Sequence, residues 1–341
     1  MGLAVVSQAD LGLLNTFGIS EHAERLVAVE SDGQLRDALA LARQHDWPVT
    51  LLGGGSNMVL AGPVPGLTVA MRSRGRRVLE RSADSVLIEA EAGENWHQLV
   101  GWTLDHGFHG LENLSLIPGT LGAAPVQNIG AYGVELCEVF DSLEALDRGS
   151  GQLCRLDRSA CRFAYRDSLF KQQPGRFVIL RVRLRLGTCP QPRLDYAPLA
   201  AAWQATGLRR PDSRVISELV CRIRRSKLPD PVQLGNAGSF FKNPLLPAGQ
   251  ARALLLRWPA MPHYPQADGS IKLAAGWLIE QAGWKGHCQG RVGVHREQAL
   301  VLVNYGGARG AEVMTLARAI QQDVAEKFGV ELEMEPQLIG G

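Results

Sequence analysis

Residues 49–57 have the sequence Val-Thr-Leu-Leu-Gly-Gly-Gly-Ser-Asn, in which a short apolar run ends abruptly in three glycines. The preceding residues 31–45 begin with Ser31 and Gln34 in the spacing of a capping box and continue with one apolar helical face. Helix, strand and glycine loop in this order predict a small α/β unit. A second stretch, residues 116–133 (LIPGTLGAAPVQNIGAYG), is apolar, rich in glycine and almost uncharged. Such a stretch indicates backbone presented at close range to a bulky ligand.

Elements of both kinds follow one another without regular β-α-β alternation, which predicts an α+β fold. Residues 178–186 alternate strictly between aliphatic residues and a second set that includes three arginines, which is typical of a half-buried strand. The proline-rich run 189–199 marks a domain boundary. We expect further strands at 67–71 and 86–92, and helices at 95–106, near 271–281 and at 311–327, the last followed by Gly329.

Composition limits the class of protein. The formal net charge is only +2 over 341 residues, which gives no reason to expect a nucleic-acid partner. The six cysteines have no metal-ligand spacing, so we expect reduced thiols and no metal site. The chain shows no signal peptide and no apolar run of the ~18 residues that a membrane span requires. We therefore expect a cytoplasmic protein that works without a membrane, as a monomer.

Four short segments carry candidate chemistry, and each has a plain structural alternative. The loop Gly53–Asn57 could bind phosphate through backbone N–H groups, or it could be a tight turn. In Gly235–Pro244, small residues give access to Ser239, aromatic residues exclude water, and Lys242 could lower the pKa of the hydroxyl; the alternative is a serine in a turn. The basic cluster 224–227 suits a diphosphate or a solvated surface. Residues 331–335 alternate like an edge strand, with three glutamates on one face.

Taken together, these segments resemble the UDP-N-acetylenolpyruvoylglucosamine reductase family over nearly the whole chain. The longer subclass of that family carries a tyrosine loop, which Tyr196 in LDYAPL matches. The stretches that carry the resemblance lie in a single order along the chain: Asn15–Gly18, Gly53–Asn57, Gly93–His97, Gly110–Asn113, Ile117–Gly133, Cys161–Lys171, Lys227–Pro231, Gly235–Pro244, Tyr264–Glu280 and Val294–Val303.

The resemblance implies a fold and a reaction. It implies an FAD-binding region of the vanillyl-alcohol-oxidase (PCMH) type followed by a smaller α+β substrate domain. We divide the chain into FAD subdomains at 1–75 and 76–210, with the C-terminal strand 326–341 joined to the second, and a substrate domain at 211–325. The implied reaction is the NADPH-dependent reduction of UDP-N-acetylglucosamine enolpyruvate to UDP-N-acetylmuramate through non-covalent FAD. This reaction supplies peptidoglycan synthesis, and with it cell-wall growth, cell shape and division.

The resemblance also assigns roles to single residues. It implies that hydride passes from the reduced flavin to C3, that Ser239 gives the proton to C2, that Arg166 stabilises the enolate, and that Glu335 polarises or orients the site. The residues expected to bind FAD are Gly53, Gly54, Gly55, Ser56, Asn57, Pro118, Gly119, Thr120, Gly122, Gln127, Asn128, Gly130 and Tyr132. Those expected near the substrate or the nicotinamide are Tyr196, Arg224, Lys227, Asn243, Tyr264, Lys285 and Gln298.

Two departures from the family pattern bear on these roles. Ala123-Ala124 stands where some members have a serine pair, so FAD must depend on backbone N–H groups there. Gln337 stands where relatives often have an arginine, which could weaken binding of the substrate carboxylate. Two other functions stay open: a flavin oxidase of the same fold superfamily, and an inactive FAD- or nucleotide-binding module.

Overall fold

The structure is a computed structural model that describes residues 3–210 and 212–340. The mixture of helices and strands confirms the α+β class. The chain divides into two compact units. Of the described residues, unit 1 comprises 3–9, 23–55, 65–210 and 212–226, and unit 2 comprises 10–22, 56–64 and 227–340.

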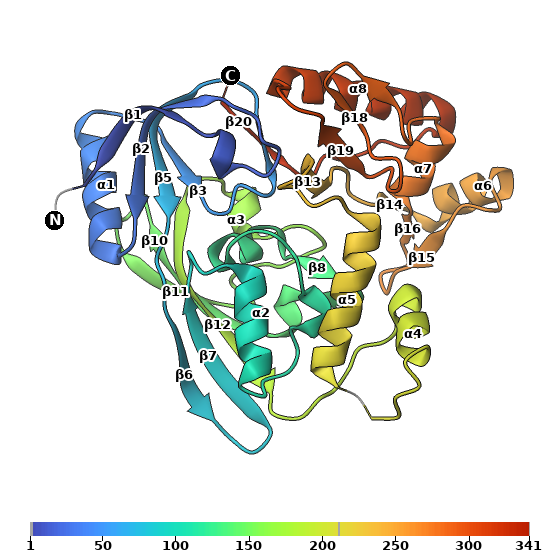
Figure 1. Cartoon of the computed structure of the whole chain (residues 1–341), viewed down its shortest axis with the longest axis horizontal. Helices are drawn as coiled ribbons and strands as arrows, with labels where there is room; N and C mark the ends of the chain where they lie inside the picture. Colours follow the sequence, from blue (N-terminus) through green and yellow to red (C-terminus); the bar gives the residue numbers. More distant parts are fainter. Residues whose placement is uncertain (1–2, 211, 341) are drawn as a thin grey trace. The chain divides into compact units, whose positions relative to one another are not determined.

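Unit 1 contains a four-stranded sheet in the order β1-β2-β5-β3, with helix α1 packed on it (Figure 1). Ser31 begins the helix as predicted, since its hydroxyl accepts a hydrogen bond from the Gln34 amide at 3.3 Å. Leu35, Ala38 and Ala42 supply the buried face of the helix. The bounds are β1 (Val5–Asp10), β2 (His22–Val29), α1 (Asp32–Gln44), β3 (Val49–Leu52) and β5 (Val64–Met71), of which the end residues Asp10, His22 and Val64 belong to unit 2.

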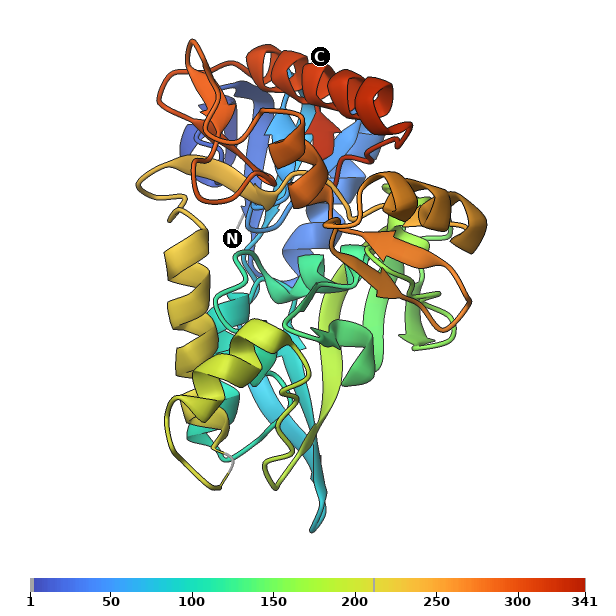
Figure 2. The same cartoon turned by 90° about the vertical axis from the view of Figure 1, so that its right-hand side faces the viewer.

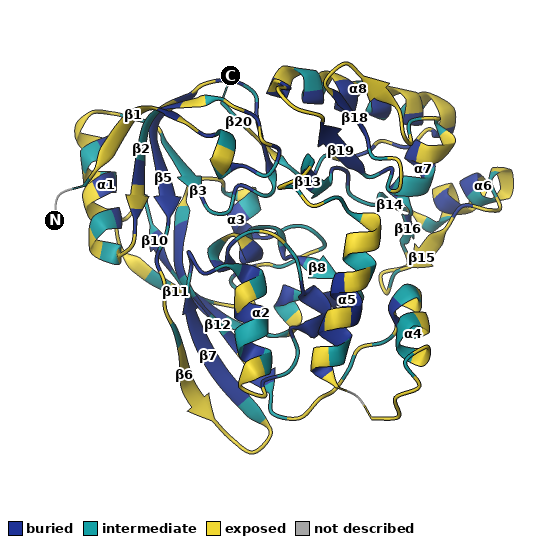
Figure 3. Cartoon of the chain, in the orientation of Figure 1, coloured by how far each residue is buried: buried dark blue, intermediate teal, exposed yellow. Residues whose placement is uncertain are grey.

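The second sheet of unit 1 has five antiparallel strands in the order β11-β10-β12-β7-β6. Figure 3 shows its central strands β7 and β12 largely buried and its edge strand β6 exposed. The strand predicted at 178–186 is confirmed as β12, whose aliphatic residues enter the core on one face. The bounds are β6 (Arg76–Arg81), β7 (Ser85–Glu91), β10 (Phe140–Asp147), β11 (Leu153–Asp157) and β12 (Phe177–Gly187).

The remaining elements of unit 1 cover the core face of this sheet or follow it in the chain. Asn95 caps α2 by accepting a hydrogen bond from the Gln98 amide at 3.0 Å, so the helix predicted at 95–106 is confirmed. The helices are α2 (Trp96–Asp105), α3 (Leu169–Gln172), α4 (Ala197–Gln204) and α5 (Ser213–Lys227), whose last residue belongs to unit 2. Short 3-10 turns lie at Glu112–Leu114, Leu121–Gln127 and Leu136–Glu138, and a small hairpin joins β8 (Gly130–Ala131) to β9 (Val134–Glu135).

Unit 2 is built on a four-stranded sheet in the order β13-β19-β18-β17, and Figures 1 and 2 show helix α8 along β18 and β19. A smaller sheet, β14-β16-β15, lies with α6 and α7 in the same unit, as does the parallel pair β20-β4. The strands are β4 (Met58–Leu60), β13 (Gly235–Ser239), β14 (Leu245–Leu246), β15 (His263–Pro265), β16 (Ile271–Leu273), β17 (Cys288–Gln289), β18 (Val292–Val294), β19 (Val301–Asn304) and β20 (Gln337–Ile339). The helices are α6 (Ala248–Arg257), α7 (Ala275–Gln281) and α8 (Gly310–Phe328), and a 3-10 turn lies at Gly12–Leu14.

The structure corrects three expectations. Residues 271–273 form strand β16, and the helix predicted near 271–281 starts only at Ala275, because Ile271 and Leu273 pair with neighbouring strands. The glutamates of 331–335 do not share one face of a strand: Glu331 and Glu333 are exposed and Glu335 is buried. The last strand, β20, pairs with β4 inside the expected first subdomain and not with residues 76–210. The division at residues 75 and 210 stays a prediction.

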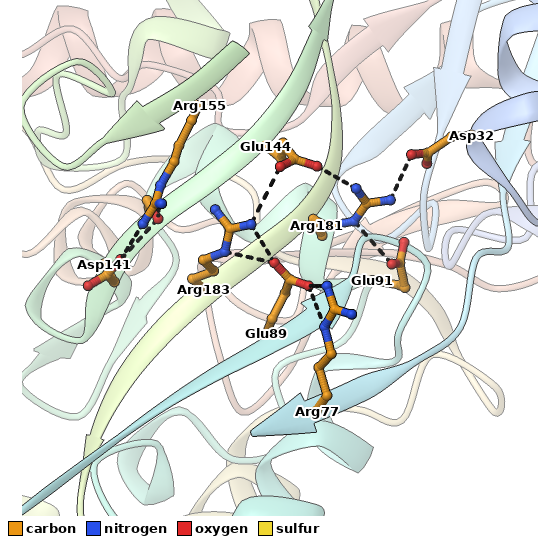
Figure 4. A network of polar contacts seen from close by, with 10 residues as sticks. Asp32, Arg77, Glu89, Glu91, Asp141, Glu144, Arg155, Arg181 and Arg183 are labelled. Carbon is orange, nitrogen blue, oxygen red and sulfur yellow. Dashed lines mark hydrogen bonds and ion pairs between the residues drawn. The ribbon is translucent and has the colours of Figure 1, made fainter. Parts of the chain in front are cut away.

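Arginines of β12 form an ion-pair network with carboxylates of the neighbouring strands (Figure 4). Arg181 lies opposite Glu91 of β7 and also opposite Glu144 of β10. Its guanidinium binds Glu144, Glu91 at 3.1 Å and Asp32 of α1 at 2.7 Å. These groups are partly buried, with 19% of the Arg181 side chain exposed, so water screens their attraction incompletely. Arg181 therefore ties α1 to the second sheet within unit 1.

Replacing Arg181 by methionine should lower the free energy of unfolding by about 2–3 kcal/mol, because three carboxylates lose their shared partner. The matched control is Arg185→Met on the same strand, whose guanidinium is 45% exposed and pairs with Glu80 and Asp141. That change should cost less than about 1 kcal/mol. Urea denaturation followed by far-UV circular dichroism measures both. Equal losses in the two variants would contradict the role given to Arg181.

Candidate functional site

The two glycine-rich stretches meet in unit 1, although 65 positions separate Gly54 from Gly119. A Cβ on Gly54 would lie 2.6 Å from the Gly119 Cα, and a Cβ on Gly53 would lie 2.6 Å from the Thr120 hydroxyl. At Gly54 no side chain larger than hydrogen fits unless the backbone of the second loop moves, and at Gly53 the Thr120 side chain would have to turn away. The two backbones therefore form one continuous surface.

The turn between β7 and α2 holds the second glycine-rich stretch in place. The Gly122 amide donates to the Ala92 carbonyl at 2.8 Å, and the Leu121 amide donates to the Glu94 carbonyl at 2.8 Å. In return, the Trp96 amide donates to the Gly119 carbonyl at 3.1 Å. Residues 119–122 are thus fixed from both sides, and their backbone is preorganised for a ligand.

This surface suits a diphosphate-containing cofactor such as FAD. The two loops consist of small residues and contact each other, so they present backbone groups with little steric bulk. A binding surface for phosphate and a flat ring system needs these properties. Ala123 and Ala124 add no side-chain donor, and the Ala123 amide donates to the Thr120 carbonyl at 3.1 Å, so these two residues offer mainly a small apolar surface. Of the first loop, Gly53, Gly54 and Gly55 belong to unit 1, whereas Ser56 and Asn57 belong to unit 2. The residues of unit 1 fit the group.

Arg166 lies against the second loop. Its Nη2 donates to the Gly130 carbonyl at 2.6 Å and its Nη1 to the Asn128 carbonyl at 3.5 Å. A Cβ on Gly130 would lie 2.9 Å from the Arg166 Nη1, so only glycine leaves room for the guanidinium. Pro118, Gln127 and Tyr132 belong to the same stretch and the same unit. Unit 1 therefore brings the predicted catalytic arginine to the predicted flavin loop.

Backbone strain gathers around this arginine. Asn128, Tyr132 and Arg166 have φ values of 45°, 50° and 54°, in the left-handed region that residues with a side chain rarely adopt. Leu116, at the start of the same stretch, has a φ of 59°. Each such residue costs on the order of 1–2 kcal/mol, which surrounding contacts must offset. Strain of this kind is typical of sites whose geometry serves function.

Tyrosine and arginine side chains of unit 1 meet beside the second loop. The rings of Tyr132 and Tyr196 lie edge to face with their centroids 5.2 Å apart. Burial raises the pKa of Tyr132 to about 12, so the phenol stays protonated. Burial also lowers the pKa of Arg224, whose buried Nε has no hydrogen-bond partner among the described residues. A desolvated guanidinium with an unused donor is suited to an anionic ligand.

His97 is a further member of this region that the sequence analysis did not single out. Its Nδ1 accepts a hydrogen bond from the Leu116 amide at 3.1 Å, which requires that nitrogen to be unprotonated. Burial, with the positive charges of Arg225 and Arg224, lowers the pKa of His97. Neutral His97 thus supports the strained start of the second loop.

Ser239 ends β13 in unit 2, next to a break in the strand pairing. The register shifts between Asn236 and Ser239, where Gly238 has a φ of 70° and its amide donates to the Asn236 side chain at 2.9 Å. This bulge re-aims the residue that follows it. Ser239 is half-buried, and its hydroxyl makes no hydrogen bond to any described residue. Its proton is therefore available for a substrate.

Glu335 lies beside the segment that follows Ser239. Its amide donates to the Phe240 carbonyl at 2.9 Å, and only 9% of the residue is exposed. The Asn57 side chain donates to the Glu335 carbonyl at 3.2 Å, so part of the first glycine-rich loop positions the glutamate within unit 2. Lys242, which the sequence offered as a cation that could lower the pKa of Ser239, forms an ion pair with Glu333. Unit 2 thus brings Ser239 and Glu335 together.

The expected substrate residues of unit 2 are only partly assembled. The Asn243 side chain accepts a hydrogen bond from the Ala275 amide at 2.9 Å, and the next residue of α7, Gly276, lies against the Gln298 side chain. Lys285 instead pairs with Glu280 at 3.0 Å, at the other end of α7. Tyr264 is exposed on β15, and Lys227 is the exposed last residue of α5.

Comparisons with known proteins bear on both units. A family model described as "FAD binding domain" matches residues 23–157, and one described as "UDP-N-acetylenolpyruvoylglucosamine reductase, C-terminal domain" matches residues 230–339. UDP-N-acetylenolpyruvoylglucosamine reductase from Pseudomonas aeruginosa is 57% identical over 99% of this chain and 100% of its own. The protein of that name from Pseudomonas putida is 54% identical over 97% of this chain and 98% of its own.

One solved structure is similar over almost its full length. The crystal structure of UDP-N-acetylenolpyruvylglucosamine reductase from Thermus caldophilus covers 99% of both chains with a TM-score of 0.67 at 24% identity. That identity shows the fold alone. With the FAD-binding domain model, it confirms the expected fold class, an FAD-binding region followed by a smaller α+β domain.

Replacing Gly54 by alanine should reduce retention of FAD, because the new methyl group would push the Gly119 backbone away at a cost of about 1–3 kcal/mol. That energy corresponds to a loss of affinity of roughly 10-fold to 100-fold. The control is Gly101→Ala in α2, where nothing lies within 4 Å of the new methyl group. The ratio of flavin to protein absorbance after gel filtration measures retention. Full retention in the Gly54 variant would contradict the close approach as a requirement for binding.

Stability should fall as the pH decreases below about 6.5, the usual pKa of histidine, toward the lowered pKa of folded His97. In that window the unfolded chain takes up a proton that folded His97 resists, and protonation would break the bond to Leu116. His97→Asn keeps an acceptor and cannot titrate, so its stability should depend less on pH there. Urea midpoints measured at several pH values compare the two proteins. Identical pH profiles would show that His97 does not titrate as described.

Proposed function

Because the chain belongs to the UDP-N-acetylenolpyruvoylglucosamine reductase family, we propose that Arg166, Ser239 and Glu335 carry out the reduction for which the family is named. The protein is an FAD-containing oxidoreductase that uses NADPH to reduce the enolpyruvyl group of UDP-N-acetylglucosamine enolpyruvate, in peptidoglycan synthesis. FAD, when bound, takes the hydride of NADPH and supplies it to the substrate. We further propose that the enzyme acts in the cytoplasm as a monomer.

The chain's own residues handle charge and protons. Hydride addition at C3 leaves negative charge on C2 and the neighbouring carboxylate, and Arg166 stabilises it through charge-assisted hydrogen bonds. Ser239 donates the proton that C2 needs. Glu335, held by Phe240 and Asn57, orients the site. One molecule of NADPH and one proton are consumed for each double bond reduced.

The observation that carries this assignment is the pairing of Ser239's neighbour Phe240 with Glu335. It places the backbone of the buried Glu335 beside the residue that follows Ser239, whose hydroxyl has no partner among the described residues, and this supports a proton donor with an orienting group nearby. Arg224, whose buried Nε has no hydrogen-bond partner among the described residues, is suited to the diphosphate. We assign the other substrate and nicotinamide contacts to Tyr196, Lys227, Asn243, Tyr264, Lys285 and Gln298.

Replacing Ser239 by alanine should separate the two half-reactions. Reduction of the flavin by NADPH needs no proton at C2, so its rate should stay near that of the unmodified enzyme. Reoxidation by the enolpyruvyl substrate should slow by about 10²–10⁴-fold, the usual contribution of a positioned general acid. Stopped-flow absorbance of the flavin resolves the two steps.

Ser239→Cys is the matched variant, because a thiol can also donate a proton and should retain part of the reoxidation rate. Slow flavin reduction with normal reoxidation in Ser239→Ala would reverse the assignment and place the residue at the nicotinamide. Loss of both rates together would point to a misfolded site and not to a missing proton donor.

A further inference from the structure

The guanidinium of Arg166 rests on two backbone carbonyls, so its position depends on what holds that backbone. The carbonyls belong to Asn128 and Gly130, which flank a single residue of the second glycine-rich stretch. Backbone in a left-handed conformation does not stay in place without support, because the conformation itself is unfavourable. The support must come from side chains that reach into the stretch.

Asn128 provides this support through its side-chain amide. Its Nδ2 donates to the Glu135 carboxylate at 2.9 Å and to the Ala164 carbonyl at 3.2 Å, and its Oδ1 accepts from the Cys137 amide at 3.0 Å. The residue is fully buried. The amide thus joins the second loop to β9, to the turn after it, and to the loop that carries Arg166.

The chemistry of the partners fixes the orientation of this amide. A backbone N–H such as that of Cys137 can only donate, and a carbonyl such as that of Ala164 can only accept. The oxygen of Asn128 must therefore face Cys137, and its nitrogen must face Ala164 and Glu135. Since these three bonds engage both ends of the amide, Asn128 can offer a cofactor little except its backbone.

Glu135 closes the arrangement from the other side. It pairs with Gly130 in the β8-β9 hairpin, and its Cγ lies 3.0 Å from the place where a Gly130 Cβ would be. The Arg166 Nη1 lies 2.9 Å from the same point. Arg166 and Glu135 thus enclose Gly130, and Asn128 binds the glutamate whose backbone pairs with that glycine.

We propose that Asn128 and Glu135 are positioning residues for Arg166, which they hold by fixing the two carbonyls on which its guanidinium rests. The inference rests on the proposed role of Arg166 in stabilising the enolate. A displaced guanidinium fails mainly in the step that develops negative charge, because a misplacement of about 1 Å can cost on the order of 100-fold in rate. Flavin reduction by NADPH develops no such charge at the substrate.

The test compares Asn128→Gly and Asn128→Asp in the FAD-loaded enzyme. Glycine tolerates the left-handed backbone but has no amide. Aspartate also tolerates it, but sets a carboxylate against Glu135 and the Ala164 carbonyl. Measured for each bound flavin, both variants should be slowed more in reoxidation by the enolpyruvyl substrate than in reduction by NADPH, by a factor on the order of 10-fold to 100-fold. Asn128→Asp combined with Glu135→Gln should recover part of the reoxidation rate. In this double variant the glutamine amide can donate to the aspartate, which restores the hydrogen bond between the two side chains in the opposite direction.

Asp147→Ala is the stability control in the same unit. Asp147 accepts hydrogen bonds from the Gly149 amide at 2.8 Å and from Arg176, at the turn between β10 and β11. This variant should unfold at a lower temperature, with both half-reaction rates unchanged for each bound flavin. If the Asn128 variants slow both half-reactions equally, the residue acts only on overall stability and the proposal is wrong.

Arg166→Ala distinguishes a failure of the positioning role of Asn128 from a failure of the proposed function. Slow reoxidation in Arg166→Ala with normal reoxidation in both Asn128 variants would overturn the positioning role and leave the proposed function intact. Normal reoxidation in Arg166→Ala would overturn the proposed function itself. A crystal structure of Asn128→Gly gives a readout without turnover: the Arg166 Nη2 should leave the Gly130 carbonyl, and an unchanged contact would contradict the proposal. If neither Asn128 variant folds, Glu135→Ala must show the same selective slowing.

Discussion

The contact between the Gly54 and Gly119 backbones is the constraint on which unit 1 depends. A Cβ at Gly54 would lie 2.6 Å from the Gly119 Cα, so any side chain there would separate the two loops. The contact places a strand end and a loop from a different part of the chain side by side, with backbone groups as their common surface. The turn between β7 and α2 then fixes the second loop, and Arg166 rests on its far end. The expected cofactor surface and the arginine proposed as catalytic thus share one piece of backbone.

The sequence predicted the elements whose pattern is local. Strand β12 and helix α8 bury the apolar residues that recur with the period of a strand and of a helix. Ser31 and Asn95 cap the helices that they precede. The family resemblance was confirmed because many motifs occur in one order, which no single glycine loop could establish. Local pattern failed at residues 271–273, since three residues are too few for a period and only pairing with β14 and β15 makes them a strand.

What the sequence did not reveal depends on contacts between distant residues. Asn57 was expected at the cofactor, and its side chain holds the carbonyl of Glu335, 278 positions away. The sequence left open that Lys242 lowers the pKa of Ser239, and in the structure Lys242 binds Glu333 because the segment after Ser239 pairs with residues 333–335. Glu135 gave no signal at all, since its importance comes from Asn128 and Gly130 only once the hairpin has formed. A pattern along the chain carries no information on such partners.

The strained backbone around Arg166 follows from the same arrangement. A guanidinium that binds the carbonyls of both Asn128 and Gly130 needs a turn that regular secondary structure does not supply. The left-handed residues Asn128, Tyr132 and Arg166 provide that turn, and the buried amide of Asn128 offsets part of its cost through three hydrogen bonds. The hydrogen bonds of Asn128 offset the strain of the same short turn. If these bonds are lost, the turn should change its conformation locally while the rest of unit 1 stays folded. The rigidity of this turn therefore depends on the side chains around Arg166 and not on the sheets and helices of unit 1.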